Sequence, residues 1–249
     1  MDNSFHIIIP SRYASTRLPG KAMADIAGRP MIQRVIEQCR KSDADSVIVA
    51  TDDERISEVA KKSRAISVMT SGHHRSGSER VAEAARIMDL DDYEVIVNVQ
   101  GDEPGMPPSL INQVARAVPD CGLRAMSTAV TPIRSGSEMT EPSVVKVVMN
   151  AGGDALYFSR SPIPFDRNRN EPNLSYAKRH IGIYGYRTEF IRDYAGMAPC
   201  PLEELEQLEQ LRVLWHGGQI KCVQVDNLPP TGVDTEQDLE AFRSYFSLK

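Results

Sequence analysis

The chain has few cysteines, and their spacing excludes several classes of protein. Four occur among 249 residues, at Cys39, Cys121, Cys200 and Cys222. No two of them form a Cys-x-x-Cys pair, and their scatter does not suggest a disulfide framework. We therefore expect reduced thiols in a cytoplasmic protein.

Excess positive charge and long apolar runs are also lacking. The net charge is −5, from 29 basic and 34 acidic residues, which argues against a nucleic-acid-binding protein. No run approaches the roughly 20 apolar residues that span a bilayer, so no membrane insertion is expected. The N-terminus leads straight into a predicted strand, without the successive regions of a signal peptide. We expect a soluble intracellular protein.

Short apolar runs and amphipathic stretches alternate through the first half of the chain. Hydrophobic residues make up 41% and charged residues 25%, as in ordinary globular proteins. The predicted strands cover residues 6–9, 46–51, 66–69 and 94–99. The predicted helices cover residues 31–41, a stretch from about 55, a stretch around 81–88 and residues 108–118. Because these strands are apolar on both faces, we predict an α/β fold with a mostly parallel sheet and helices on both sides.

This alternation loosens from about residue 125. The predicted strands here are 125–130, 144–149, 155–158 and 181–186, with an irregular excursion over 161–178. A long helix over 202–215, a strand over 220–225 and a closing helix over 235–246 complete the prediction. We interpret residues 1–249 as a single domain, with about 125–200 including a smaller protruding mixed lobe suited to subunit contacts.

A cationic loop lies between the first predicted strand and the first predicted helix. It carries Arg12, Arg17 and Lys21 in a turn rich in glycine, proline and serine. Loops at the carboxyl ends of strands are where open α/β sheets bind ligands, and three cations suit a nucleoside triphosphate. The alternative is a solvated surface loop with no specific partner.

A second loop, over residues 70–80, offers groups for a base edge. Ser76 and Gly77 expose hydroxyl and backbone groups, and Arg80 follows in the first helical turn. Ser76 and Glu79 also fit a capping box, and both interpretations can hold together. The adjacent histidines at 73 and 74 are a weak metal signal, and we favour no metal there.

Two carboxylates could serve a magnesium ion. Asp102 follows Gly101 just beyond a predicted strand, and Asp234 lies in a turn before the last helix. Mg²⁺ takes one or two carboxylates from a protein and its other ligands from phosphates and water. Alternatively, Asp102 is a turn residue and Asp234 or Thr235 caps the helix.

Polar side chains near the ends of later elements suit an acid sugar. Arg160, His180 and Tyr184 could bind a carboxylate and hydroxyls, although they also fit ordinary strand positions. Glu209 and Gln210 lie on the long predicted helix. Glu206, on the same helix, is interpreted as part of a solvated face.

Together and in this order, these segments resemble one family, the 3-deoxy-manno-octulosonate cytidylyltransferases or CMP-Kdo synthetases. The matching segments span almost the whole chain: 9–21, 50–54, 76–80, 97–104, 145–148, 155–160, 179–187, 208–212 and 232–235. The resemblance implies a Rossmann-like sugar-nucleotide transferase fold, a homodimer, and Mg²⁺-dependent transfer of CMP from CTP to Kdo for lipopolysaccharide.

The resemblance also implies a role for each candidate residue. Triphosphate binding falls to Arg12, Arg17 and Lys21, cytidine recognition to Ser76, Gly77, Arg80 and Gln100, magnesium binding to Asp102 and Asp234, and sugar binding to Arg160, His180, Tyr184, Glu209 and Gln210. Arg12, Lys21, Asp102 and Asp234 are the expected catalytic set. The chain departs from the usual family pattern at Ser11, Ala22, Arg29, Gly105-Met106 and Glu236, and Ala22 loosens the turn that aims Lys21.

Three other functions compete with this one. The same chemistry could act on a sialic or amino-substituted acid sugar, which the segment 179–187 bears on most. A non-catalytic nucleotide-binding protein could have kept the pocket, although both aspartates argue against it. A dehydrogenase is disfavoured, because the first loop lacks a G-x-G-x-x-G pattern.

Overall fold

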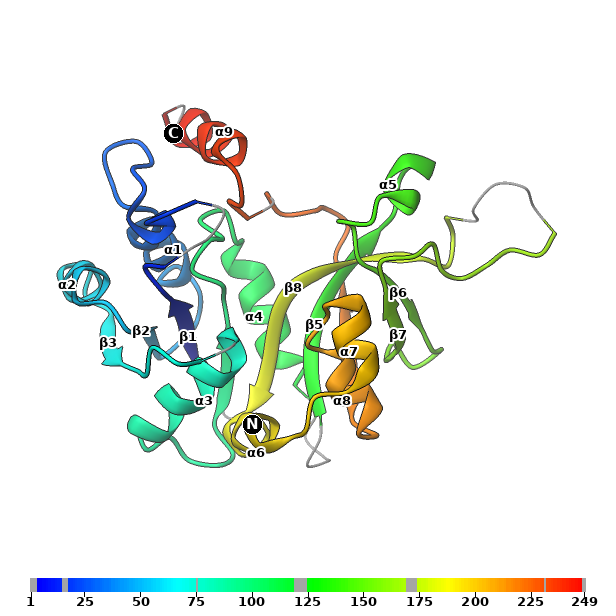
Figure 1. Cartoon of the computed structure of the whole chain (residues 1–249), viewed down its shortest axis with the longest axis horizontal. Helices are drawn as coiled ribbons and strands as arrows, with labels where there is room; N and C mark the ends of the chain where they lie inside the picture. The colour runs from blue at the N-terminus through cyan, green and yellow to red at the C-terminus, as the bar shows by residue number, and fades with distance from the viewer. Residues whose placement is uncertain are drawn as a thin grey trace.

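One sheet of nine strands organises the molecule (Figure 1). The computed structural model describes residues 4–14, 18–74, 76–118, 125–168, 174–230 and 232–247. The strand order is β3-β2-β1-β4-β8-β5-β9, with β6 paired to β8 and to β7. The strands are β1 (Phe5–Ser11), β2 (Ser46–Thr51), β3 (Ile66–Met69), β4 (Val95–Asn98), β5 (Ala125–Pro132), β6 (Lys146–Met149), β7 (Ala155–Ser159), β8 (Lys178–Arg187) and β9 (Gln219–Gln224).

The sheet is parallel in one half and mixed in the other. β1 pairs in parallel with β2 and β4, placing Ile8 opposite both Ile48 and Asn98. β8 runs antiparallel between β4 and β5, and β5 pairs in parallel with β9. The predicted α/β fold with a mostly parallel sheet is confirmed. Much of the segment expected to form a lobe is continuous with this sheet, because β5 and β8 lie within it.

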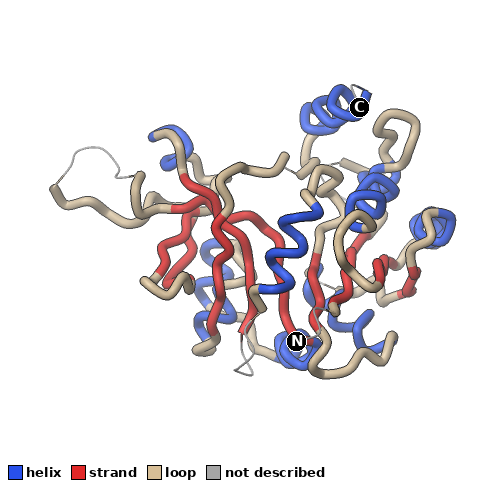
Figure 2. Tube along the Cα trace, turned by 180° about the vertical axis from the view of Figure 1, so that it is seen from behind, coloured by secondary structure: helices blue, strands red, loops and turns tan. Residues whose placement is uncertain are grey.

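Helices cover both faces of the sheet (Figures 1 and 2). They are α1 (Met31–Cys39), α2 (Glu54–Lys62), α3 (Gly77–Ile87), α4 (Pro108–Arg116), α5 (Gly136–Thr140), α6 (Thr188–Gly196), α7 (Pro201–Glu206), α8 (Leu211–Trp215) and α9 (Glu236–Ser247). Successive strand residues face opposite sides, so Ile7 and Ile9 pack with α1 and α4 while Ile8 packs with α3. Both faces of β1 are therefore buried, as its unbroken apolar run predicts.

Two parts of the helical prediction were wrong. The single helix expected over 202–215 is two short helices, because Gln207 ends α7 in the left-handed conformation, with φ 52°. Two helices, α5 and α6, occupy segments where the sequence predicted none. α5 starts at a Ser135 cap, which accepts a hydrogen bond from the amide of Glu138.

The end of the chain returns to the first helix. After β9, the backbone crosses the top of the view in Figure 1 and places α9 beside α1. Val233, Leu239 and Phe242 pack there with Ile26 and Met31. This return brings residues 232–235 beside the loop that follows β1.

The described cysteines, Cys39, Cys200 and Cys222, are buried and unpaired. Within the described ranges, none of the helices has both the length and the apolar character that crossing a bilayer requires.

Candidate active site

A cleft of about 420 Å³ opens at the carboxyl ends of β1 and β4. Eight of the predicted site residues line it: Arg12, Lys21, Ser76, Gly77, Arg80, Gln100, Asp102 and Glu209. They come from four segments, which the sheet brings to one edge. Arg17 lies outside the described residues.

Two glycines keep the cleft open where the backbone segments converge. A Cβ atom at Gly101 would lie 3.0 Å from the carbonyl oxygen of Pro10 and 3.1 Å from Oγ of Ser11. A Cβ atom at Gly77 would lie 3.3 Å from Oε1 of Gln100. Glycine therefore lets the loop after β4 touch the end of β1, and lets α3 begin against Gln100.

Lys21 lies between the two predicted magnesium ligands. Its Nζ is 2.6 Å from Oδ2 of Asp102 and 3.1 Å from Oδ1 of Asp234. The same group donates to the carbonyl oxygen of Val233 at 2.9 Å. The carboxylates of Asp102 and Asp234 thus both contact the ammonium group of Lys21.

A third carboxyl group, that of Glu103, lies close to Asp102 and Asp234. Burial, reinforced by the charges of Asp102 and Asp234, raises the pKa of Glu103 to about 8. Glu103 is therefore largely protonated at neutral pH, which removes its own repulsion with Asp102 and Asp234.

Asp234 is placed by the cap of α9. Oδ2 of Asp238 accepts hydrogen bonds from the amides of Asp234 and Thr235 and from the Thr235 hydroxyl. The amide of Val233 donates to the carbonyl oxygen of Asp102 at 2.8 Å. The expected cap at Thr235 is confirmed, and it fixes the Asp234 side chain beside Asp102.

The loop before α3 combines capping with exposure to the cleft. Oγ of Ser76 accepts from the amide of Glu79 at 3.3 Å, as the predicted cap requires. Arg80 is buried, and its guanidinium donates to Oδ2 of Asp52 and Oγ1 of Thr70 at 3.0 and 2.6 Å. These bonds hold Arg80 rigidly at the wall of the cleft.

Beside the start of α3, Nε2 of Gln100 donates to Oδ1 of Asn98 at 3.2 Å. Asn98 is the last residue of β4, so this bond ties the Gln100 amide to the end of the strand. The amide keeps its second polar atom for the cleft.

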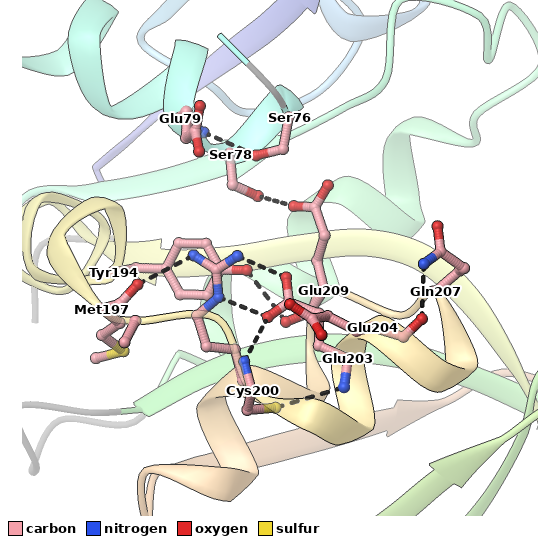
Figure 3. A network of polar contacts seen from close by, with 12 residues as sticks. Ser76, Ser78, Glu79, Tyr194, Met197, Cys200, Glu203, Glu204, Gln207 and Glu209 are labelled. Atoms are coloured by element: carbon pink, nitrogen blue, oxygen red, sulfur yellow. Dashed lines mark hydrogen bonds and ion pairs between the residues drawn. The ribbon is translucent and has the colours of Figure 1, made fainter.

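Glu209 joins α3 to the other side of the cleft (Figure 3). Its carboxylate accepts a hydrogen bond from Oγ of Ser78 at 2.9 Å. Burial raises the pKa of Glu209, against the lowering effect of that bond.

Tyr184 and Gln210 lie behind Glu209. The Tyr184 hydroxyl donates to Oε1 of Gln210 at 3.2 Å, and both residues line a small second cavity with Ser78. Burial raises the pKa of Tyr184 well above its usual value, so the phenol stays protonated.

His180 faces the same side of β8. Its Nε2 lies 2.9 Å from Oγ1 of Thr128, and its ring meets Phe158 edge to face. Burial lowers the pKa of His180 to about 3, so the imidazole is neutral near pH 7. It can exchange hydrogen bonds but carries no charge to a substrate carboxylate.

Arg160 is not free to face a substrate as the sequence analysis expected. Its guanidinium donates to the carbonyl oxygens of Glu206 at 2.7 Å, Pro142 at 3.0 Å and Gln207 at 3.4 Å. These bonds hold the turn between α7 and α8. A direct role in sugar binding stays a prediction.

The interpretation of Glu206 as a solvated side chain was wrong. Its carboxylate accepts from Oγ of Ser159 at 2.6 Å and from the amide of Arg160 at 2.9 Å. These bonds cross from α7 to the end of β7, a contact that the helical pattern of 202–215 does not encode.

Comparison with known proteins settles the family. A sequence profile described as Cytidylyltransferase matches residues 6–221. A 3-deoxy-manno-octulosonate cytidylyltransferase of Coxiella burnetii (strain RSA 493 / Nine Mile phase I) is 48% identical over 247 residues, which are 97% of this chain and 99% of that protein. One of Proteus mirabilis (strain HI4320) is 50% identical over 248 residues, 97% of each. The chain belongs to the 3-deoxy-manno-octulosonate cytidylyltransferase family.

Solved structures agree with this family. A CMP:2-keto-3-deoxy-manno-octonic acid synthetase, solved in complex with CTP, superposes with a TM-score of 0.88 at 37% identity over 98% of both chains. A 4-diphosphocytidyl-2C-methyl-D-erythritol synthase of Anaerococcus prevotii DSM 20548 has a TM-score of 0.65 at 14% identity, covering 99% of this chain and 100% of its own. The second match shows a shared fold alone.

Two further residues, which the sequence analysis did not include among the site residues, make polar contacts in or near the site of this cytidylyltransferase family member. His74 lines the cleft, with its Nε2 2.6 Å from Oε2 of Glu83. Lys146 is fully buried, and its Nζ donates to the carbonyl oxygens of Glu141, Val144 and Arg160. His74 precedes α3 and Glu83 lies on it, so their contact depends on the fold of the loop between them. The sequence also gave no sign that Lys146, the first residue of β6, is buried.

Proposed function

We propose that this protein transfers CMP from CTP to 3-deoxy-D-manno-octulosonate (Kdo), giving CMP-Kdo and pyrophosphate for lipopolysaccharide synthesis. The observation that carries the proposal is the convergence of Lys21, Asp102 and Asp234 at one end of the cleft. Arg12, Ser76, Gly77 and Gln100 line the same cleft as Lys21 and Asp102. This arrangement suits a triphosphate beside Lys21 and a base beside Ser76 and Gln100.

The reaction that fits the site is a direct in-line displacement. The anomeric 2-hydroxyl of Kdo attacks the α-phosphorus of CTP, a new O–P bond forms, and the bond to the β-phosphate oxygen breaks. The hydroxyl loses its proton, and pyrophosphate leaves with the bonding pair. Arg12 and Lys21 would stabilise the charge that accumulates on the leaving group.

Magnesium dependence is part of the proposal. Two carboxylate oxygens that already converge on a cation are the donor set that Mg²⁺ prefers. Asp102 and Asp234 would hold the ion, and when bound it supplies charge neutralisation and a lower pKa for the attacking hydroxyl.

The sugar would bind beyond the cleft, between Glu209, Gln210, Tyr184 and His180. A neutral imidazole, a protonated phenol and an amide offer hydrogen bonds to several hydroxyl groups. Arg160 would contribute by ordering the turn that carries Glu209 and Gln210.

We also propose a homodimer in the cytoplasm. Five of the ten large apolar side chains that the described residues expose lie between residues 156 and 215: Leu156, Phe165, Tyr176, Leu205 and Trp215. We propose that these side chains form one apolar surface, and such a surface is one that a partner covers. The buried, unpaired cysteines are compatible with a reducing compartment.

The assay that tests the function measures pyrophosphate release by the purified protein with CTP, Mg²⁺ and Kdo. ATP or UTP replaces CTP in one set of controls, and sialic acid replaces Kdo in another. We expect release with CTP and Kdo alone. Release with another acid sugar would support the proposed transfer reaction but show that Kdo is not the only substrate. No release with any sugar would favour a nucleotide-binding protein without catalysis.

A further inference from the structure

The turn between α7 and α8, residues 207–210, presents two polar side chains to the site. Glu209 reaches Ser78 across the cleft, and Gln210 accepts from Tyr184. Gln210 is 4% exposed, yet its Nε2 has no hydrogen-bond partner among the described residues. A buried donor of this kind is satisfied when a ligand oxygen arrives, so the turn must hold the amide in one place.

Tyr194 contacts the backbone of this turn (Figure 3). It is 4% exposed, and its hydroxyl donates to the carbonyl oxygen of Glu209 at 3.1 Å. The guanidinium of Arg212 lies over its ring, 4.8 Å from the ring centre. The position of the Glu209 backbone therefore depends on the position of the Tyr194 ring.

Arg212 is itself fixed by a buried two-point contact. Its Nε and Nη2 donate to the two carboxylate oxygens of Glu203 at 2.7 and 2.5 Å. Nη1 donates to the carbonyl oxygen of Met197 at 3.4 Å. The pair thus ties the end of α6 to the first turns of α7 and α8. The hydrogen bond to Glu203 is the main cause that raises the pKa of Arg212.

The first half of the turn is held by a different group. Arg160 binds the carbonyl oxygens of Glu206 and Gln207, so it fixes the turn where α7 ends. Tyr194 fixes the half that carries Glu209. The two supports are separate, which allows each to be tested without removing the other.

We propose that Arg212 and Glu203, acting through Tyr194, are positioning residues that hold Glu209 and Gln210 for the acid sugar. The proposal rests on the proposed function, because it assigns that substrate to this turn. A buried ion pair contributes little net stability compared with apolar side chains of similar size. A planar guanidinium paired at two points does, however, fix an orientation that a flexible side chain cannot.

The test uses Tyr194→Phe, which keeps the ring beneath Arg212 and removes the hydroxyl. The KM for Kdo should rise about three- to tenfold, the loss expected of one hydrogen bond. The KM for CTP should not change, and the melting temperature should fall by only a few degrees, as expected of one hydrogen bond. Hydrogen exchange of the amides of Leu211 and Arg212, which donate to the carbonyl oxygens of Leu208 and Glu209, should become faster.

A second pair of variants separates this role from general stabilisation. Arg212→Lys keeps the charge and loses the two-point contact, so it should raise the KM for Kdo and loosen the same amides. Arg192→Lys is the matched control, because Arg192, on α6, pairs with Asp92 in the segment before β4, away from the turn. If Arg212→Lys does not fold, Tyr194→Phe still decides the question.

Two results would overturn the positioning role. One is unchanged exchange in residues 207–212 of Tyr194→Phe, and the other is an equal rise in the KM of both substrates. A wild-type protein that releases no pyrophosphate with Kdo would refute the proposed function. The exchange measurement would still decide whether Arg212, Glu203 and Tyr194 order the turn.

Discussion

Lys21 holds together three segments that are far apart in the sequence. It binds Asp102, 81 residues later, and both Val233 and Asp234, more than 200 residues later. The sequence predicted Lys21, Asp102 and Asp234 as site residues, because each follows a strand or precedes a helix. It could not predict that Lys21 would bridge the two carboxylates, because that contact depends on the path of the segment after β9, which packs α9 beside α1.

The bridge leads to a prediction about metal binding. Replacing Lys21 with methionine removes the cation that neutralises Asp102 and Asp234, so a divalent ion should bind more tightly without nucleotide. We expect an increase of roughly tenfold, about 1.4 kcal/mol, because a partly buried pair exceeds the 1 kcal/mol or less of exposed pairs. Titration with Mn²⁺ followed by electron paramagnetic resonance measures it.

Lys21→Arg is the control for this experiment, because it keeps a cation at the same place and should leave the Mn²⁺ affinity close to that of the wild type. Equal affinities for the wild type and Lys21→Met would contradict the idea that lysine and metal share the site.

His180 gives a prediction about acid stability. Its pKa is about 3 in the folded protein and 6.5 in an unfolded chain, so the unfolded chain takes up the proton first. This residue therefore does not weaken the fold above pH 6.5, and it costs stability as the pH falls from 6.5 towards 3. The slope is at most about 1.4 kcal/mol per pH unit.

Urea unfolding at pH 8, 7, 6 and 5 measures this effect. The His180→Asn variant should lose less stability between pH 6.5 and 5 than the wild type. The exposed His73 is the control position for the same substitution. Parallel curves for the wild type and His180→Asn would show that the buried histidine does not cause the acid loss.

At the level of elements, short-range patterns predicted the first half of the fold well. The strand at residues 66–69 was predicted with the bounds that it has, and α3 begins at the predicted Ser76 cap. The break between α7 and α8 was missed, because its causes are remote. Arg160, from the end of β7, binds the carbonyl oxygens at the break, while the leucines of 202–214 keep a helical period through it.

β8 shows a second long-range constraint. A Cβ atom at Gly185 would lie 2.5 Å from Oγ of Ser127 and 2.9 Å from Cγ2 of Val118. Gly185→Ala should therefore force β8 away from β5 and α4 and lower the free energy of unfolding by about 1–3 kcal/mol. Gly182→Ala on the same strand is the matched control, since its Cβ would meet nothing within 4 Å. Urea midpoints compare the two, and equal losses would contradict this account.

At the level of the whole molecule, the exposed apolar side chains lead to a prediction about assembly. The protein should sediment with about twice the 27.6 kDa mass of one chain. Leu156→Asp puts a charge on a side chain that is 61% exposed on β7, and should shift the protein towards the monomer. Ile87→Asp, at an exposed position on α3, is the control and should leave the mass unchanged. A monomeric wild type, or the same shift in both variants, would refute the proposed interface.

The late position of Asp234 also has a consequence during translation. A ribosome makes the loop after β1 first and Asp102 next, and it adds Asp234 and α9 only after β9. A chain cut short before residue 232 keeps most of the cleft but lacks half of its acidic pair. On the proposed function, such a chain would lack one of its two magnesium ligands and would not turn over CTP.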